Sequence, residues 1–104
     1  MTDLEMTRLC AEAMGIATEE SFGVLAAYYK EGLGLIQETY DPLHDDAQAM
    51  ALVKRFELRI DHNELDGWRV SKDYGFKRYP DRAYSGVLNR AIVECVAGMI
   101  AARR

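Results

Sequence analysis

The residues best suited to binding chemistry form a basic and aromatic segment between positions 68 and 82. Five lysine or arginine residues alternate there with four aromatic residues. Aromatic rings stack on bases or guanidinium groups, while lysine and arginine neutralise phosphates, so the mixture indicates a surface for a nucleotide-like ligand or a partner protein. A solvated face, or pairing with acidic residues elsewhere, would also explain these charges, and Trp68 and Val70 are expected in the core. The predicted surface consists of Arg69, Lys72, Tyr74, Phe76, Lys77, Arg78, Tyr79 and Arg82.

A second group of residues has the types of a metal site but not its spacing. His44, Asp45 and Asp46, together with Asp61 and His62, offer nitrogen and oxygen ligands to a divalent metal. A metal-dependent phosphohydrolase is therefore the alternative function. However, three adjacent residues at a helix start cannot all point at one ion, and capping of the helix explains Asp45 and Asp46. We predict no metal and no other cofactor.

The sequence contains no set of residues typical of nucleophilic catalysis. It has no glycine-rich phosphate loop, no cysteine–histidine pair at usable spacing and no serine beside an obvious base. Tyr28, Tyr29 and Tyr40 suggest an aromatic wall, although sheet tyrosines more often bury one face. We therefore predict a binding protein without enzymatic activity.

The element that organises the chain is a helix in its middle. Pro42 predicts a bend over residues 40–43, after which Asp45 or Asp46 caps the helix and opposes its dipole. The helix continues to about residue 56 and runs directly into a strand over residues 57–61, in which apolar and polar residues alternate. The apolar stripe of the helix is predicted to consist of Ala49, Met50, Val53 and Phe56, flanked by Leu52.

Two further helices are expected near the ends of the chain. Thr2 and Glu5 fit a capping box for a helix over residues 3–14, which Gly15 ends. A closing helix is expected to start near Asp81 or Tyr84 and to continue almost to the last residue. Its apolar stripe is predicted from Tyr84, Leu88, Ala91, Ile92, Cys95 and Met99, widened by Val87 and Val96.

The segments between these helices are expected to be hairpins. Residues 16–39 fit either a helix or a hairpin with its turn over 30–34, and the tyrosines and β-compatible residues favour the hairpin. Asp66-Gly67 predicts a turn between the strand over 57–61 and a strand over 68–71. The chain is therefore predicted to be one domain, residues 1–104, of the α+β class: a small antiparallel sheet packed with three helices in the order α-β-β-α-β-β-α.

Composition limits the location and the partners. The net charge of −4 hides five basic and fourteen acidic residues over 1–67, against eight basic and three acidic over 68–104. Oppositely charged halves can attract each other inside one fold or between protomers, and we expect a homo-oligomer; the acidic total disfavours nucleic acid as a partner. No long apolar run or secretory signal is present, so we expect a protein that does not contact membranes. Cys10 and Cys95 are predicted to be buried, reduced thiols, which indicates a cytoplasmic location.

Three blocks of sequence resemble a family of small phage and prophage proteins described as having a phage ABA-sandwich domain. They are residues 1–15, residues 40–50 (YDPLHDDAQAM) and residues 88–97 (LNRAIVECVA). The resemblance implies a helix-sheet-helix sandwich, a phage origin and no catalytic residues. It makes a phage accessory protein the leading expectation, acting in the bacterial host cytoplasm against host defence by binding a host protein or sequestering a small anionic nucleotide.

Overall fold

The computed structural model describes residues 1–31, 34–72 and 81–103, which contain three helices and six strands. The helices are α1 (Asp3–Ala13), α2 (Asp46–Phe56) and α3 (Leu88–Ala102). The strands before α2 are β1 (Ala17–Ser21), β2 (Val24–Glu31) and β3 (Gly34–Tyr40). Those before α3 are β4 (Arg59–Asn63), β5 (Gly67–Lys72) and β6 (Asp81–Ser85). The α+β class, the three helices and the antiparallel pairing are confirmed.

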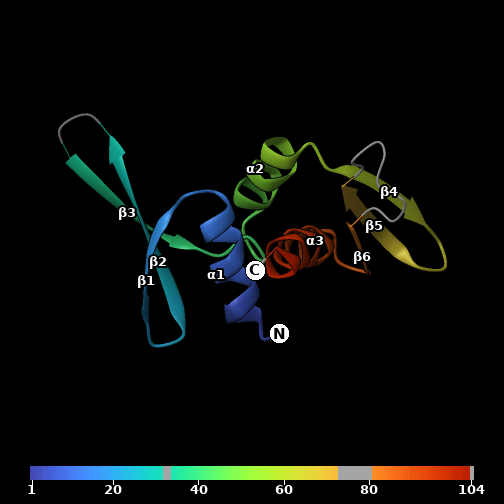
Figure 1. The fold of residues 1–104 in the computed structure, drawn as a ribbon, viewed down its shortest axis with the longest axis horizontal. Coiled ribbons are helices and arrows are strands. Elements are labelled where there is room, and N and C mark those ends of the chain that lie inside the picture. Colours follow the sequence, from blue (N-terminus) through green and yellow to red (C-terminus); the bar gives the residue numbers. More distant parts are fainter. Residues whose placement is uncertain (32–33, 73–80, 104) are drawn as a thin grey trace.

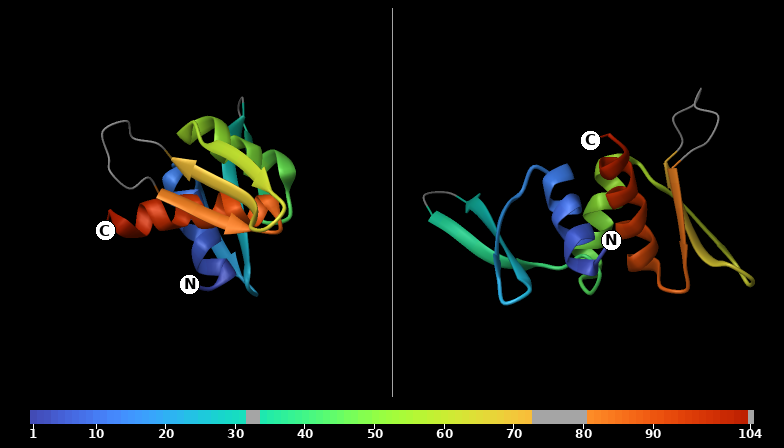
Figure 2. Two further views of the ribbon diagram at one scale, coloured as in Figure 1. Left: turned by 90° about the vertical axis from the view of Figure 1, so that its right-hand side faces the viewer. Right: turned by 60° about the horizontal axis from the view of Figure 1, so that its bottom comes forward.

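The strands form two separate sheets, and the helices lie between them (Figure 1). Sheet A has the order β1-β2-β3 and packs on α1, while sheet B has the order β4-β5-β6 and packs on α3. Helices α1 and α3 pack on each other, and α2 packs on α3, as the second view in Figure 2 also shows. The layers are thus sheet, helices, sheet, whereas the resemblance implied helix, sheet, helix.

Sheet A confirms the hairpin that the sequence favoured and adds a strand to it. β2 and β3 pair over the predicted hairpin, and β1 pairs with the other edge of β2. The β1–β2 connection has only Phe22 and Gly23 as its central residues, both with positive φ, as a two-residue hairpin turn requires. Glutamates fill much of β1, so its sequence by itself shows little strand character.

Sheet B corrects the predicted start of the closing helix. Asp81 and Tyr84, the two expected starting points, belong to β6, which pairs with β5 before α3 begins at Leu88. Tyr84 is 45% exposed and is not part of the apolar stripe of a helix. Residues 81–85 can pair with β5 because Gly86 separates them from the helix, so the helix starts after the glycine.

Local signals set the helix ends as expected. The Thr2 hydroxyl accepts a hydrogen bond from the Glu5 backbone N–H at 3.1 Å, and the Asp45 carboxylate accepts one from the Gln48 N–H at 3.0 Å. Helix α2 ends at Phe56, and its C-cap residue Glu57 takes a left-handed conformation with φ of 52°. The following strand therefore begins at Arg59 and not at Glu57, because residue 57 is used to terminate the helix.

The core lies where the helices meet the two sheets. The predicted core residues Val70, Ala91, Ile92 and Cys95 are buried. In α2 the predicted stripe residue Ala49 and the flanking Leu52 are buried, whereas Met50 is 40% exposed. Among the described residues, no helix is long and apolar enough to cross a lipid bilayer. The largest fully buried side chains belong to Cys10, Pro42, Leu52, Val70, Ile92, Val93, Cys95, Val96 and Met99.

Candidate functional site

The structure describes only part of the predicted basic and aromatic surface. Five of its residues lie outside the described part of the chain: Tyr74, Phe76, Lys77, Arg78 and Tyr79. Arg69 and Lys72 lie on β5, and the backbone of Arg82 lies on β6, where it pairs with Ser71.

The strand separates Arg69 from Lys72. Side chains alternate between the two faces of a strand, so residues three apart point in opposite directions. Val70, which is fully buried against the helix layer, marks the inner face of sheet B. Lys72 is two residues from Val70 and therefore lies on the same inner face, while Arg69 lies on the outer face. The two predicted binding residues therefore do not form one patch on β5.

The outer face of sheet B carries a group of arginines that we call the arginine face. Its first row consists of Arg59 and the buried Ser71, with the backbone of Arg82 paired to Ser71 on the next strand. Its second row is Asp61, Arg69 and Tyr84. Figure 2 shows this sheet in front of α3, with its other face turned away from the helices. Strand register thus brings Arg59, Arg69 and Tyr84 onto one face from three different strands.

A single carboxylate serves the two described guanidinium groups of this face. Asp61 Oδ2 lies 2.8 Å from Arg69 Nη2 and 3.3 Å from Arg59 Nε. The hydrogen bond from Arg69, aided by the charges of both arginines, holds the pKa of Asp61 below its usual value although partial desolvation opposes this. The same hydrogen bond raises the pKa of Arg69, with a smaller contribution from Tyr84. The face is therefore positively charged even with Asp61 fully ionised.

Two features of the arginine face leave it able to bind a further group. Arg59 has 69% of its side chain exposed, and the Tyr84 ring is also open to solvent. The Arg69 side chain is 38% exposed, although its Nε is buried and out of reach of a ligand. An anion above Arg59 would meet an exposed guanidinium, and a planar group would find the tyrosine ring in the same row as Arg69.

Trp68 and His62 belong to the inner side of sheet B. Their ring centroids are 4.6 Å apart with an interplanar angle of 60°, and they pair across β4 and β5. Trp68 also packs against the core. Trp68, which was expected in the core, is thus partly buried at the edge of it, and the exposed His62 packs on its ring.

The residues of the alternative metal site each have another contact. His44 Nδ1 lies 2.8 Å from Asp41 Oδ2, and Asp45 caps α2. Asp46 accepts a hydrogen bond from Asn89, while Asp61 pairs with arginines as described above. Within residues 1–31, 34–72 and 81–103, no three histidine, cysteine, aspartate or glutamate residues are grouped so as to hold a metal ion.

The predicted tyrosine wall is not assembled in the described structure. Tyr40 is buried opposite Leu25 on the inner face of sheet A. Tyr28, three residues from Leu25 along β2, lies on the outer face, where its hydroxyl donates to Glu19 Oε2 at 2.9 Å. That hydrogen bond raises the pKa of Tyr28. The side chain of Tyr29 lies outside the described residues.

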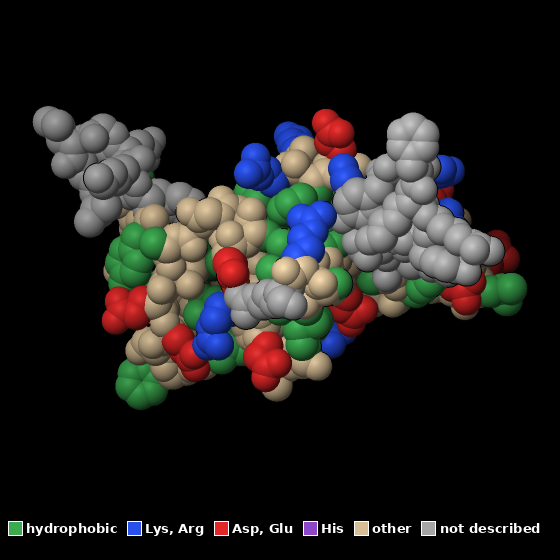
Figure 3. All heavy atoms as spheres, in the orientation of Figure 1, with side chains coloured by type: hydrophobic (Ala, Val, Ile, Leu, Met, Phe, Trp, Pro, Cys, Tyr) green, Lys and Arg blue, Asp and Glu red, His purple; other side chains and the backbone are tan. Residues whose placement is uncertain are grey.

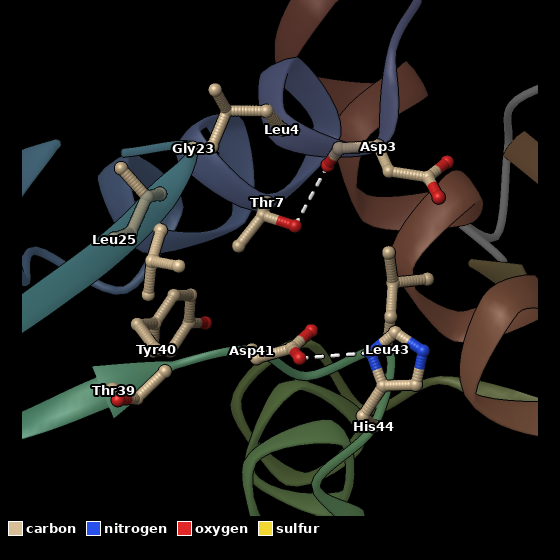
Figure 4. Close-up of a pocket in the computed structure, with 11 residues that line it drawn as sticks. Asp3, Leu4, Thr7, Gly23, Leu25, Thr39, Tyr40, Asp41, Leu43 and His44 are labelled. Carbon is tan, nitrogen blue, oxygen red and sulfur yellow. Dashed lines mark hydrogen bonds and ion pairs between the residues drawn. The ribbon is translucent and has the colours of Figure 1, made fainter. Parts of the chain in front are cut away.

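A pocket of about 240 Å³ opens between sheet A, the start of α1 and the bend before α2 (Figure 4). Leucines form much of its wall, and the Asp41–His44 pair lies at one end of it (Figure 4). The sequence analysis missed this pocket because its wall comes from segments that are far apart in the chain. The lining residues are Asp3, Leu4, Thr7, Gly23, Val24, Leu25, Thr39, Tyr40, Asp41, Leu43 and His44.

The first turns of the three helices meet beside this pocket. Arg90 of α3 donates to Asp3 of α1 at 3.0 Å, and Asn89 donates to Asp46 of α2 at 2.8 Å. The positive ends of α1 and α2 are thus already compensated by carboxylates from the chain. This end of the helix layer is suited to holding the helices together and does not favour an anionic ligand.

Comparisons with known proteins provide no relative for this chain. No protein-family model, no curated protein and no solved structure matches it.

Proposed function

We propose that this protein binds a small anionic ligand, of the nucleotide class, through the arginine face and acts without catalysing a reaction. The observation that carries the proposal is the register of sheet B, which places Arg59, Arg69 and the exposed Tyr84 on the same face around a single carboxylate, Asp61. Phosphate oxygens would pair with the guanidinium groups, and a base would stack on the Tyr84 ring.

The nucleotide version is favoured over a protein partner by the shape and size of the face. Six register positions on three short strands offer enough room for a ligand with one or two phosphates and one ring. A stable protein interface buries about 1,200 Å² or more, which requires a larger surface than these six positions of the arginine face. Arg69 is also pre-positioned by Asp61, so little rotamer entropy is lost when a phosphate binds beside it.

The biological setting of the proposal is a phage accessory protein that sequesters a signalling nucleotide in the host cytoplasm. The resemblance of three sequence blocks to small phage proteins supports this setting. Both described cysteines are free and buried, as is typical of a reducing compartment, which supports the cytoplasmic location. Non-enzymatic binding is supported by the engagement of His44, Asp45 and Asp61 in contacts within the chain.

Isothermal titration calorimetry against linear and cyclic nucleotides, with inorganic phosphate as a further titrant, tests this proposal. We expect at least one nucleotide to bind, and we expect Arg59→Gln to weaken it by about 10-fold to 100-fold, which corresponds to one charge-assisted hydrogen bond. Tyr84→Leu should weaken nucleotides more than phosphate, because only nucleotides have a base to stack.

Lys54→Gln is the matched control, since Lys54 is an exposed cation on α2 and does not belong to the arginine face. It should leave the affinity unchanged. A flat response of the wild-type protein to the whole panel, or equal losses for Arg59→Gln and Lys54→Gln, would overturn the proposal.

A further inference from the structure

Phe22 lies at a position where its side chain does not stabilise the folded monomer. Its side chain is fully exposed, at 103% of the reference area, at the tip of the β1–β2 hairpin. Its φ of 52° lies in the left-handed region, which a bulky residue adopts only at a cost. Asparagine followed by glycine is the favoured pair for this kind of turn, and here phenylalanine precedes Gly23. Local stability therefore does not explain the choice of phenylalanine.

The pocket described above begins directly beside this tip. Gly23 and Val24, the next two residues, form part of its rim, while Phe22 itself is not among the residues that line it. Leu4, Leu25 and Leu43 supply an apolar wall (Figure 4). A dry apolar cavity of about 150 Å³ accommodates a benzene ring. The 240 Å³ of this pocket is thus sufficient for one phenylalanine side chain.

We infer that two copies of this chain associate about a two-fold axis, with Phe22 of each copy inserted into the pocket of the other. A two-fold interface uses the same patch on both subunits, so an anchor and the socket that receives it must lie side by side on one surface. Phe22 and the pocket meet this condition because Gly23 and Val24 connect them. Figure 3 shows exposed hydrophobic side chains at the lower left, over the end of sheet A where β1 joins β2.

The area of such an interface fits a modest dimer. Each phenylalanine that becomes buried removes about 150–250 Å² from water, so the two anchors and the two pocket walls account for a large part of the roughly 1,200 Å² of a small specific interface. Val24, of which 49% is exposed, adds apolar area at the rim. Exposed aromatic anchors that enter pockets are the residues that dominate binding energy in most interfaces.

This dimer is independent of the proposed ligand site. The anchor and the pocket belong to sheet A and α1, whereas the arginine face is the outer face of sheet B, on the other side of the helix layer (Figure 1). Phe22→Asn therefore tests the dimer and Arg59→Gln tests nucleotide binding, and the failure of one proposal is distinguishable from the failure of the other.

Analytical ultracentrifugation of the full chain tests the inference. The key variant is Phe22→Asn, because asparagine suits the left-handed turn, so the fold should become more stable while the anchor disappears. We expect its dimer dissociation constant to rise by about 100-fold or more, with an equal or higher melting temperature. Leu65→Ser is the control: Leu65 is 96% exposed at the β4–β5 hairpin and should not affect the dimer.

A mixing experiment identifies the socket. Leu4→Glu places a carboxylate in the pocket wall and should also yield a monomer, with its circular dichroism spectrum checking the fold. Phe22→Asn retains an intact pocket, and Leu4→Glu retains an intact anchor, so their mixture should form a heterodimer held by one of the two contacts.

Three outcomes overturn the inference. They are a wild-type protein that sediments as a monomer at millimolar concentration, a Phe22→Asn variant that dimerises like the wild type, and a mixture that forms no heterodimer. A wild-type monomer whose pocket binds small aromatic probes instead would show that the pocket takes a free ligand.

Discussion

Gly67 lies so close to Ser85 that no side chain fits between β5 and β6 at this point. A Cβ on Gly67 would lie 2.8 Å from the carbonyl oxygen of Ser85, and the φ of Gly67 is +76°. Gly67→Ala is therefore expected to lower the free energy of unfolding by about 2–4 kcal/mol, through left-handed strain together with a displaced strand. Urea unfolding followed by circular dichroism measures this loss.

Gly98→Ala provides the matched comparison for Gly67. Gly98 lies inside α3, is exposed, and has no atom within 4 Å of the position of an added Cβ. Alanine should raise the free energy of unfolding by about 0.5–1 kcal/mol, because it restricts the unfolded chain and suits a helix interior. A similar loss at both glycines would contradict the close approach of β5 and β6.

Gln48 connects α2 to sheet A and to the bend between them. Its side chain is buried, donates to Glu38 Oε1 and to the Thr39 carbonyl at 2.9 and 2.8 Å, and accepts a hydrogen bond from the Asp41 backbone N–H. Gln48→Leu should cost about 2–3 kcal/mol, because it leaves these partly buried groups without a partner. Chemical denaturation measures the cost.

Gln48→Glu separates the hydrogen bonds of Gln48 from its packing. The carboxylate retains an acceptor for Asp41 but cannot donate, and it lies beside the carboxylate of Glu38. We expect this variant to be less stable than the wild type at pH 7 and to recover part of the difference near pH 4, where a protonated carboxyl can donate again. A difference that does not vary with pH would argue against the Glu38 contact.

Asp61 should make the stability of sheet B sensitive to acid. Because Arg69 and Arg59 lower its pKa in the folded state, its contribution is fully present above the unfolded pKa, near about 4, and is lost as the pH falls through the lower folded pKa. The stability difference between wild type and Asp61→Asn should therefore be constant above about pH 5 and shrink in more acidic solution.

Urea unfolding across this pH range measures the difference, and a carbon NMR titration of the Asp61 carboxyl measures its pKa directly. In 0.5 M salt the shift should become smaller, since the pair is partly exposed. An Asp61 carboxyl that titrates at or above the usual aspartate value would contradict the described ion pairs.

Cys10 should be chemically inert in the folded protein. Its thiol lies 3.6 Å from the Val93 carbonyl, between α1 and α3. Burial, and to a smaller extent the neighbouring Cys95, raise its pKa to about 12, so almost no thiolate exists at pH 8. We expect no reaction with a maleimide over hours without denaturant and complete reaction in urea, measured by mass spectrometry. A Leu65→Cys variant should react within minutes at its exposed site.

The sequence alone determined the features that depend on neighbours within one or two turns of chain. Thr2 and Asp45 cap their helices as predicted, and the turn of sheet B lies at residues 64–66, directly before Gly67, within the segment that the Asp66-Gly67 pair indicated. Each of these interactions closes over three or four residues, so the residues that form it are visible together in the sequence. The α+β class follows from the same local signals, since three helical stripes and two hairpins allow few other arrangements.

Only the tertiary structure decided which side of each element faces which layer. β1 and β6 have weak strand sequences and exist because β2 and β5 offer them free edges, which no local signal reports. The same pairing places Arg59, Arg69 and Tyr84 on one face and sends Lys72 to the other. Strand register and layer order depend on contacts between residues that are distant along the chain. They follow from how apolar faces are buried together, a property of the whole fold that no single segment contains.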